Sequence, residues 1–175
     1  MSDPDVRLCR LGGTENDVQA ICEVLASAPS YSVAISGALP SPKDAASVFS
    51  SRPPGLPAER KHVYGIYCGT QLVGMADVLQ GYPSRDIAYI GLLLITESFQ
   101  GKGLGRSSHQ RICLLARDWG CQRIRLAVVE ANHSATGFWL RCGYSDTGVR
   151  VPYRCGTVHS QSMIFEMALL DDTDC

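Results

Sequence analysis

The sequence predicts an α/β (α+β) protein, a mixed sheet covered by helices, in a single domain over residues 1–175. Short runs of alternating or wholly apolar residues have the length and pattern of strands. Other segments repeat apolar residues every three or four positions, which is typical of helices with one buried face. Two such helices follow the runs at 87–95 and 123–129, and 175 residues are enough to bury one sizeable core.

The first expected elements are a strand at residues 6–11 and a helix after it. Thr14, with Asp17 three residues later, forms a capping pair typical of a helix start. The apolar residues of this helix recur with helical spacing: Val18, Ile21, Cys22 and Leu25. They predict one buried stripe.

The segment at residues 29–57 differs in composition from what precedes it. It contains six prolines: Pro29, Pro40, Pro42, Pro53, Pro54 and Pro57. Because proline fixes φ and has no N–H, we expect regular structure to be interrupted here. A short helix at residues 43–50 is expected between the breaks.

The middle of the chain predicts three strands. Two of them, at residues 62–68 and 71–79, flank Gly69-Thr70, a two-residue turn that indicates a β-hairpin. The third, at residues 87–95, is apolar on both faces, so we expect it at the centre of the sheet.

The remaining elements alternate in type. In order they are helix 104–119, strand 123–129, helix 134–142, and strands 144–151 and 160–168. Gly120 ends the first of these helices, and an acidic tail is expected from Asp171 onward.

Composition and charge exclude several function classes. Sixteen basic and seventeen acidic residues give a net charge of −1, so attraction to nucleic acid or to an anionic membrane is not expected. No apolar stretch approaches the roughly 20 residues needed to span a bilayer. The acidic N-terminus lacks the features of a secretory signal. We therefore expect cytoplasmic residence, with no nucleic-acid or membrane partner.

The eight cysteines show no pattern for metal binding. No Cys-x-x-Cys pair and no His/Cys pair at ligand spacing occurs in the sequence. Several lie on apolar faces of expected elements, where cysteine behaves as a small hydrophobic residue. Reduced, mostly buried thiols and no metal site are the expectation.

A glycine-rich turn at residues 100–106, between strand 87–95 and the next helix, is the strongest functional signal. Glycines let a ligand approach the backbone, and a helix start offers free amide N–H groups at the positive end of its dipole, so the turn suits a phosphate. A Walker loop does not fit, because Lys102 is followed by glycine. A dinucleotide fingerprint does not fit either, because Arg106 or Ser108 stands where its third glycine is needed.

The pattern Gln-x-x-Gly-x-Gly, formed by Gln100, Gly103 and Gly105, resembles the acetyl-CoA signature of the GCN5-related N-acetyltransferase (GNAT) superfamily. A tight turn that only lets a helix pack on a sheet would look similar. A second stretch favours the family: Asn132, an alanine three residues later, a pair of aromatic residues, and Gly-Tyr ending at Tyr144 resemble the family's second signature. The order and spacing of both signatures agree with the family over residues 86–150.

The resemblance implies a mostly antiparallel sheet of about six to seven strands flanked by helices, with acetyl-CoA wedged where two central strands diverge. The residues that it places at acetyl-CoA lie on the central strand, in the glycine turn and in the second signature: Leu93, Leu94, Ile95, Gln100, Gly101, Lys102, Gly103, Leu104, Gly105, Arg106, Asn132, Phe138 and Trp139. The basic residues near the turn suit the phosphates of coenzyme A.

The activity that the resemblance implies is transfer of the acetyl group of acetyl-CoA to a primary amine of a small molecule or peptide, by direct attack in a ternary complex. The alternative is a non-catalytic acyl-CoA-binding module. Residues 29–57 correspond to a region that commonly shapes the acceptor pocket in the family, or they form only a surface connection. The expected partners are acetyl-CoA and an amine acceptor, with a homodimer as a further possibility by analogy.

The candidates for the general base depart from the family pattern. Family members often carry a glutamate on the central strand, whereas the ionisable side chain here is Tyr89, with Asp86 just before the strand. Asp86 has a structural alternative as a turn residue. Backbone N–H groups near Leu93 or Leu94 would stabilise the oxyanion.

The candidate for the general acid departs as well. The family commonly has a tyrosine where this chain has Trp139, and an indole N–H does not titrate. Either Tyr144 substitutes, or no acid is required, since a thiol with a pKa near 8.5 leaves tolerably as thiolate. Packing at the start of the next strand is the alternative role for Tyr144.

Overall fold

The computed structural model describes residues 5–169 and places all its strands in one seven-stranded sheet of order β1-β2-β3-β4-β5-β7-β6. The strands are β1 (Val6–Leu11), β2 (Lys61–Cys68), β3 (Gln71–Gln80), β4 (Ile87–Ile95), β5 (Arg123–Val129), β6 (Ser145–Cys155) and β7 (Val158–Ala168). Only the β4–β5 pair is parallel among these strands; the others pair antiparallel. The mixed, mostly antiparallel sheet expected from the sequence is confirmed, with β4 as its middle strand.

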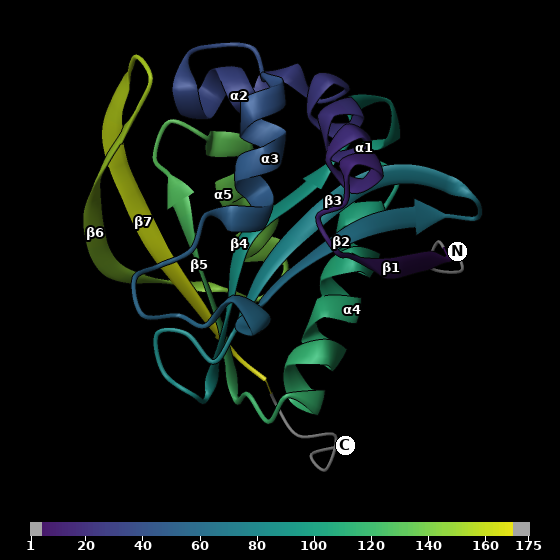
Figure 1. Ribbon diagram of the computed structural model, residues 1–175. Helices are drawn as coiled ribbons and strands as arrows, with labels where there is room; N and C mark the ends of the chain where they lie inside the picture. Colours follow the sequence, from purple (N-terminus) through teal and green to yellow (C-terminus); the bar gives the residue numbers. More distant parts are fainter. Residues whose placement is uncertain (1–4, 170–175) are drawn as a thin grey trace.

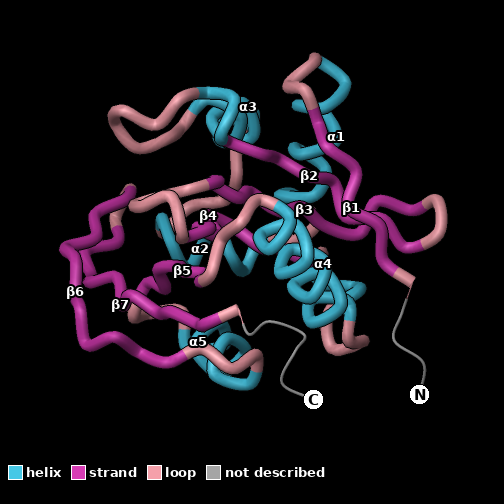
Figure 2. Tube along the Cα trace, turned by 90° about the horizontal axis from the view of Figure 1, so that it is seen from below, coloured by secondary structure: helices cyan, strands magenta, loops and turns pink. Residues whose placement is uncertain are grey.

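Five α-helices of the described chain cover the two faces of this sheet (Figure 1). They are α1 (Glu15–Ala26), α2 (Pro29–Ser36), α3 (Pro42–Ser50), α4 (Leu104–Asp118) and α5 (His133–Arg141). Figure 2 shows α1 and α3 on one side of the sheet and α4 and α5 on the other. Helix α2 contacts α1 on one side and the β6–β7 hairpin on the other.

The core is divided by the sheet into two clusters. Ile112 and Ala116 of α4, and Trp139 of α5, pack in the larger cluster. Ile21 and Leu25 of α1 pack in the smaller one. Each cluster buries the apolar stripe that the helical spacing predicted, so the sheet is held from both sides.

The first turns of the N-terminal helices confirm the capping pair and correct one expectation. The Thr14 side chain caps α1 by accepting from the Asp17 backbone N–H. The Asp17 carboxylate in turn accepts from the Thr14 backbone N–H at 3.0 Å. The expected interruption near Pro29 is wrong, because α2 begins there. Proline suits the first helical position, where its missing N–H has no partner to lose. Pro42 begins α3 in the same way.

The closing strands are longer than expected. They pair from Ser145 and Glu166 out to Cys155 and Val158, and Tyr144 lies buried just before β6 rather than within it. The acidic tail expected from Asp171 lies outside the described residues.

Strands β4 and β5 pair over only four residues of each, 87–90 with 123–126. Beyond these pairs β4 continues along β3 while β5 continues along β7, so the two parallel strands diverge. The register of β3 and β4 shifts at Asp77 and Val78, whose partners are Leu92 and Ile90, and this leaves Gly91 as the extra residue of a bulge. The divergence and the bulge lie at the same level of β4.

Residues 5–169 contain no single helix with the length and apolar composition to cross a membrane, although α1 and α2 together pass the same test as a bent pair. Within the same residues no group of three or more His, Cys, Asp or Glu side chains is arranged to hold a metal ion.

Candidate functional site

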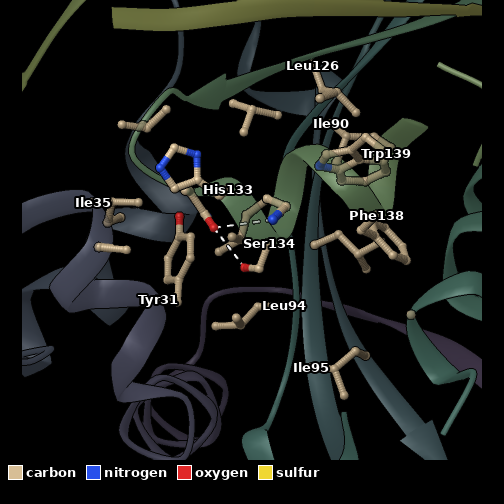
Figure 3. A pocket seen from close by; sticks show the side chains of 18 of the residues that line it. Tyr31, Ile35, Ile90, Leu94, Ile95, Leu126, His133, Ser134, Phe138 and Trp139 are labelled. Atoms are coloured by element: carbon tan, nitrogen blue, oxygen red, sulfur yellow. Dashed lines mark hydrogen bonds between the residues drawn. The ribbon is translucent and has the colours of Figure 1, made fainter. Parts of the chain in front are cut away.

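A cavity of about 990 Å³ opens where β4 and β5 diverge. Its walls come from α2, from residues 90–95 of β4, from the glycine turn, from β5 and from the start of α5. In Figure 3 Tyr31 and Ile35 approach the cavity from α2, while Phe138 and Trp139 lie across from them on α5. The cavity is therefore one continuous space between two helices that are about a hundred residues apart in the sequence.

The glycine turn supplies backbone to one end of the cavity. Gly101 and Gly103 line it, and both have positive φ, +73° and +82°. Gly103 is the N-cap of α4, and within the described residues no side chain caps this helix start. The first amide N–H groups of α4 are therefore available, at the positive end of a 15-residue helix.

Gly105 has a different role from Gly103. A Cβ atom at Gly105 would lie 3.3 Å from the ring of Phe138. The absence of that atom lets the α5 aromatic residue pack against the first turn of α4. Gly105 therefore lies where α5 packs on the first turn of α4.

The other side chains of the turn divide into two groups. The Gln100 amide donates to the Ile95 carbonyl at 2.8 Å and so fixes the turn to the end of β4, and both Gln100 and Arg106 line the cavity. Lys102 does not line the cavity. Its ammonium donates to the Ser98 carbonyl at 2.9 Å and lies 4.8 Å from the centre of the Phe99 ring. Leu104 points into the core. The structure thus brings Gln100 and Arg106, but not Lys102 and Leu104, to the cavity.

The start of α5 carries the second signature. Asn132 is the N-cap, and its Oδ1 accepts from the Ser134 hydroxyl at 3.1 Å and the Ala135 backbone N–H at 3.3 Å. Asn132, Phe138 and Trp139 all line the cavity. Leu93, Leu94 and Ile95 of β4 line it as well, so the structure brings together both signatures and the central strand.

Comparison with known proteins agrees with this geometry. A family model described as the acetyltransferase (GNAT) family matches residues 34–144, which include the glycine turn, β5 and α5. The chain belongs to the GNAT family.

One curated relative and two solved structures are similar to this chain in sequence or in fold. An N-acetyltransferase of Mycobacterium bovis, described as uncharacterized, is 27% identical over 100 residues, which are 57% of this chain and 62% of that protein. The match thus spans about three fifths of that relative's length. An acetyltransferase from Thermus thermophilus has a similar fold, with a TM-score of 0.74 and 24% identity over 96% of this chain and 99% of that one. Spermidine N-acetyltransferase from Vibrio cholerae, solved with CoA and spermine, has a TM-score of 0.71 and 13% identity, over 94% of this chain and 95% of that one.

Two of the expected proton-transfer residues of this GNAT chain lie outside the cavity lining. Tyr89 is half-buried edge-to-face against Tyr82, and burial raises its pKa. Asp86 precedes β4 at the end away from the glycine turn and pairs with Arg123 at 2.7 Å. Hydrogen bonds from Ser84 and Arg123 hold the pKa of Asp86 at about 2, which makes it a poor proton acceptor. The geometry therefore favours the structural role for Asp86.

Tyr144, the expected acid, is buried behind Trp139. Its hydroxyl lies 3.0 Å from Nε2 of His109 on α4, and its ring contacts the Trp139 ring with centroids 5.2 Å apart. Burial raises the pKa of Tyr144 and lowers that of His109 to about 4, so both are neutral near pH 7. Tyr144 is absent from the cavity lining among the described residues. This arrangement suits a packing role.

Sequence reasoning missed one group at the cavity and one residue beside it. Tyr31 of α2 and Tyr153 of β6 line it, and the Tyr153 hydroxyl donates to the Ile35 carbonyl at 2.9 Å. Part of the proline-rich segment therefore forms a cavity wall. The residue beside the cavity is Asp77 of β3, which packs against Gly91. The sequence signal that could have identified it is a single acidic residue within the apolar run 73–79.

The Asp86→Asn change should alter kcat by less than about twofold at each pH and leave the shape of the pH profile unchanged. The carboxylate is tied to Arg123 and Ser84, away from the cavity, so its loss removes no group from the reacting atoms. Steady-state kinetics of the variant between pH 5 and 9 measure this. If an ionisation disappeared from the kcat–pH profile of this variant, Asp86 would again be a candidate for the general base.

The Tyr144→Phe change should lower the free energy of unfolding by about 1–2 kcal/mol, because it leaves the buried Nε2 of His109 without this partner. Denaturant unfolding followed by circular dichroism measures the loss. We expect kcat to remain close to that of the parent protein. A fall of about 100-fold in kcat with the fold intact would instead support Tyr144 as the acid.

Proposed function

We propose that this chain transfers the acetyl group of acetyl-CoA to a primary amine of a small molecule or peptide, by direct attack within a ternary complex. The observation that supports this most is the single cavity that runs from the bare helix start at Gly103 to the aromatic wall at Tyr31. Its volume of about 990 Å³ is at the upper end of small-ligand sites. A coenzyme arm and an acceptor can therefore share it.

The coenzyme would enter at the glycine turn. Backbone N–H groups at the start of α4 would bind its pyrophosphate, with Arg106 adding positive charge at the same end. Trp139 and Phe138 would pack on the arm. Lys102 faces Ser98 and Phe99 instead and contributes only to the local field.

The thioester would lie along the free edge of β4. Successive residues of a strand direct their N–H groups to opposite edges. The Thr96 N–H donates to the Val73 carbonyl on the β3 side, so by alternation the Leu94 N–H faces β3 and the Leu93 N–H faces the diverging β5. Of the two oxyanion donors expected from the sequence, Leu93 is therefore the better placed.

Acid catalysis is not needed in this scheme. Trp139 stands at the cavity and cannot release a proton, while Tyr144 is buried behind it. The leaving group is a thiolate, which is stable enough to depart without prior protonation. We therefore place the leaving thiolate against the aromatic pair with no protein acid.

The test is to incubate the purified protein with acetyl-CoA and a panel of polyamines, aminoglycosides, amino acids and peptides, while thiol release is measured. Turnover with one or more amines, and the acetylated amine by mass spectrometry, is the expected result. Tight acetyl-CoA binding by calorimetry with no thiol release across the panel would reject catalysis and leave the acyl-CoA-binding module.

A further inference from the structure

A buried ion pair lies beside the cavity and takes no part in the site described so far. Lys61 of β2 donates from Nζ to Oδ2 of Asp77 on β3 at 2.6 Å, and the two side chains are 4% and 16% exposed. Removing two charges from water costs about as much as their attraction returns. Stability alone therefore gives little reason for this buried pair.

The bulge residue Gly91 separates Asp77 from the cavity. Gly91 lines the cavity, and a Cβ atom there would lie 2.9 Å from Oδ2 and 3.4 Å from Cγ of Asp77. Gly91 is not among the glycines with positive φ, so its backbone does not require glycine. What requires glycine is the space: a side chain here would collide with Oδ2 of Asp77, so the carboxylate packs directly against the cavity-lining residue Gly91.

The surroundings of the carboxylate keep it reactive. Oδ1 of Asp77 is buried and has no hydrogen-bond partner among residues 5–169, while Oδ2 accepts from Lys61 and keeps a further lone pair. The titratable groups that face the carboxylate are Lys61 from β2 and Tyr31 from α2, with Tyr153 and Cys155 of β6 beyond Tyr31. Burial raises the pKa of Asp77 and outweighs the opposing effect of Lys61.

We propose that Asp77 is the proton acceptor for the amine, reached from the cavity past Gly91. This inference rests on the proposed acetyl transfer. An ammonium N–H gives its proton to Oδ2 of Asp77, and the freed nitrogen lone pair forms the C–N bond with the thioester carbonyl carbon. The tetrahedral species then collapses, the C–S bond breaks, and the nitrogen loses its second proton as the thiolate departs and becomes a thiol. Asp77 returns its proton to solvent.

This assignment also explains why β4 carries no acidic residue. Asp77 projects from the neighbouring strand at the level of the bulge, opposite Leu92, so β3 supplies the carboxylate that β4 lacks. The same level of β4 holds the free edge that begins after Ile90. The proton acceptor and the oxyanion donor at Leu93 would thus flank one reacting centre.

The experiment compares three variants of the full-length protein. Asp77→Asn keeps an oxygen that accepts from Lys61 but cannot take a proton, so kcat should fall by about 10²–10³-fold and the ascending limb of kcat against pH should disappear. Lys61→Met removes a cation that lowers the Asp77 pKa, so that limb should move to higher pH. Gly91→Ala places a methyl group between the cavity and Oδ2 of Asp77 and should lower kcat by at least about tenfold with the ionisation retained.

Each variant is checked for acetyl-CoA affinity by calorimetry and for its fold by circular dichroism, and Asp86→Asn is the matched control. Unchanged kcat and pH profile in Asp77→Asn would overturn the inference while the parent protein still turns over, so acetyl transfer itself would stand. If Asp77→Asn does not fold, Gly91→Ala decides: parental kcat in that variant overturns the inference. A parent protein inactive with every amine would end both the proposed function and this inference.

Discussion

Replacing Gly103 with valine is expected to weaken acetyl-CoA binding by at least about 100-fold while the protein stays folded. Gly103 has φ of +82° at the start of α4, a conformation that a β-branched residue avoids. Valine would force the turn into another conformation and place two methyl groups beside the first free amides. The strain costs about 1–3 kcal/mol, less than the stability of an ordinary domain. Isothermal titration calorimetry measures the loss of affinity.

Lys102→Ala is the matched control for this change. The Lys102 ammonium is bound to the Ser98 carbonyl and lies over Phe99, so removing it should change the acetyl-CoA affinity by less than about threefold. The two variants together separate backbone access from charge. Parental affinity in Gly103→Val would show that the pyrophosphate lies elsewhere.

Replacing Leu93 with proline is expected to lower kcat by about 10²–10³-fold with little change in acetyl-CoA affinity. Proline removes the N–H that we assign to the oxyanion, together with the leucine side chain. Proline is tolerated in a strand where the N–H faces away from the hydrogen-bonded ladder. The Leu93 N–H faces the gap between β4 and β5 rather than β3. Single-turnover thiol release at saturating acetyl-CoA measures the effect on the chemical step.

Leu93→Ala separates the backbone from the side chain. It loses the packing of Leu93 against the larger core cluster but keeps the N–H, so its kcat should stay within about threefold of the parent value. Leu94→Pro should instead unfold the protein or destabilise it strongly, because the Leu94 N–H faces β3. Equal losses of kcat in Leu93→Ala and Leu93→Pro would remove the assignment of the oxyanion donor.

Much of the fold follows from local pattern. The strands at 6–11, 87–95 and 123–129 agree residue for residue with the structure, because each segment is a short apolar or alternating run of strand length. The capping pair at Thr14 likewise identified the start of α1. Helix α2 was missed because Pro29 was interpreted as a break, although proline is well suited to a first helical turn.

The candidate site was predictable where it is made of backbone. Glycines and a helix start identify a phosphate site from the sequence because they act through main-chain N–H groups. The direction of the Lys102 side chain was not predictable, since a flexible chain chooses among several nearby acceptors. The position of Asp77 beside Gly91 was not predictable either, because it depends on a register shift between two strands. A one-residue change of register would have turned Asp77 to the other face.

The four-residue ladder between β4 and β5 leaves the sheet as two half-sheets, β1–β4 and β5–β7–β6, joined at one end only. The amide groups of a bound coenzyme arm would connect the two half-sheets where β4 and β5 have diverged. The part of the cavity next to α2, where we propose that the amine binds, would be enclosed on that side only then. This favours a kinetic order in which acetyl-CoA binds first and the amine second.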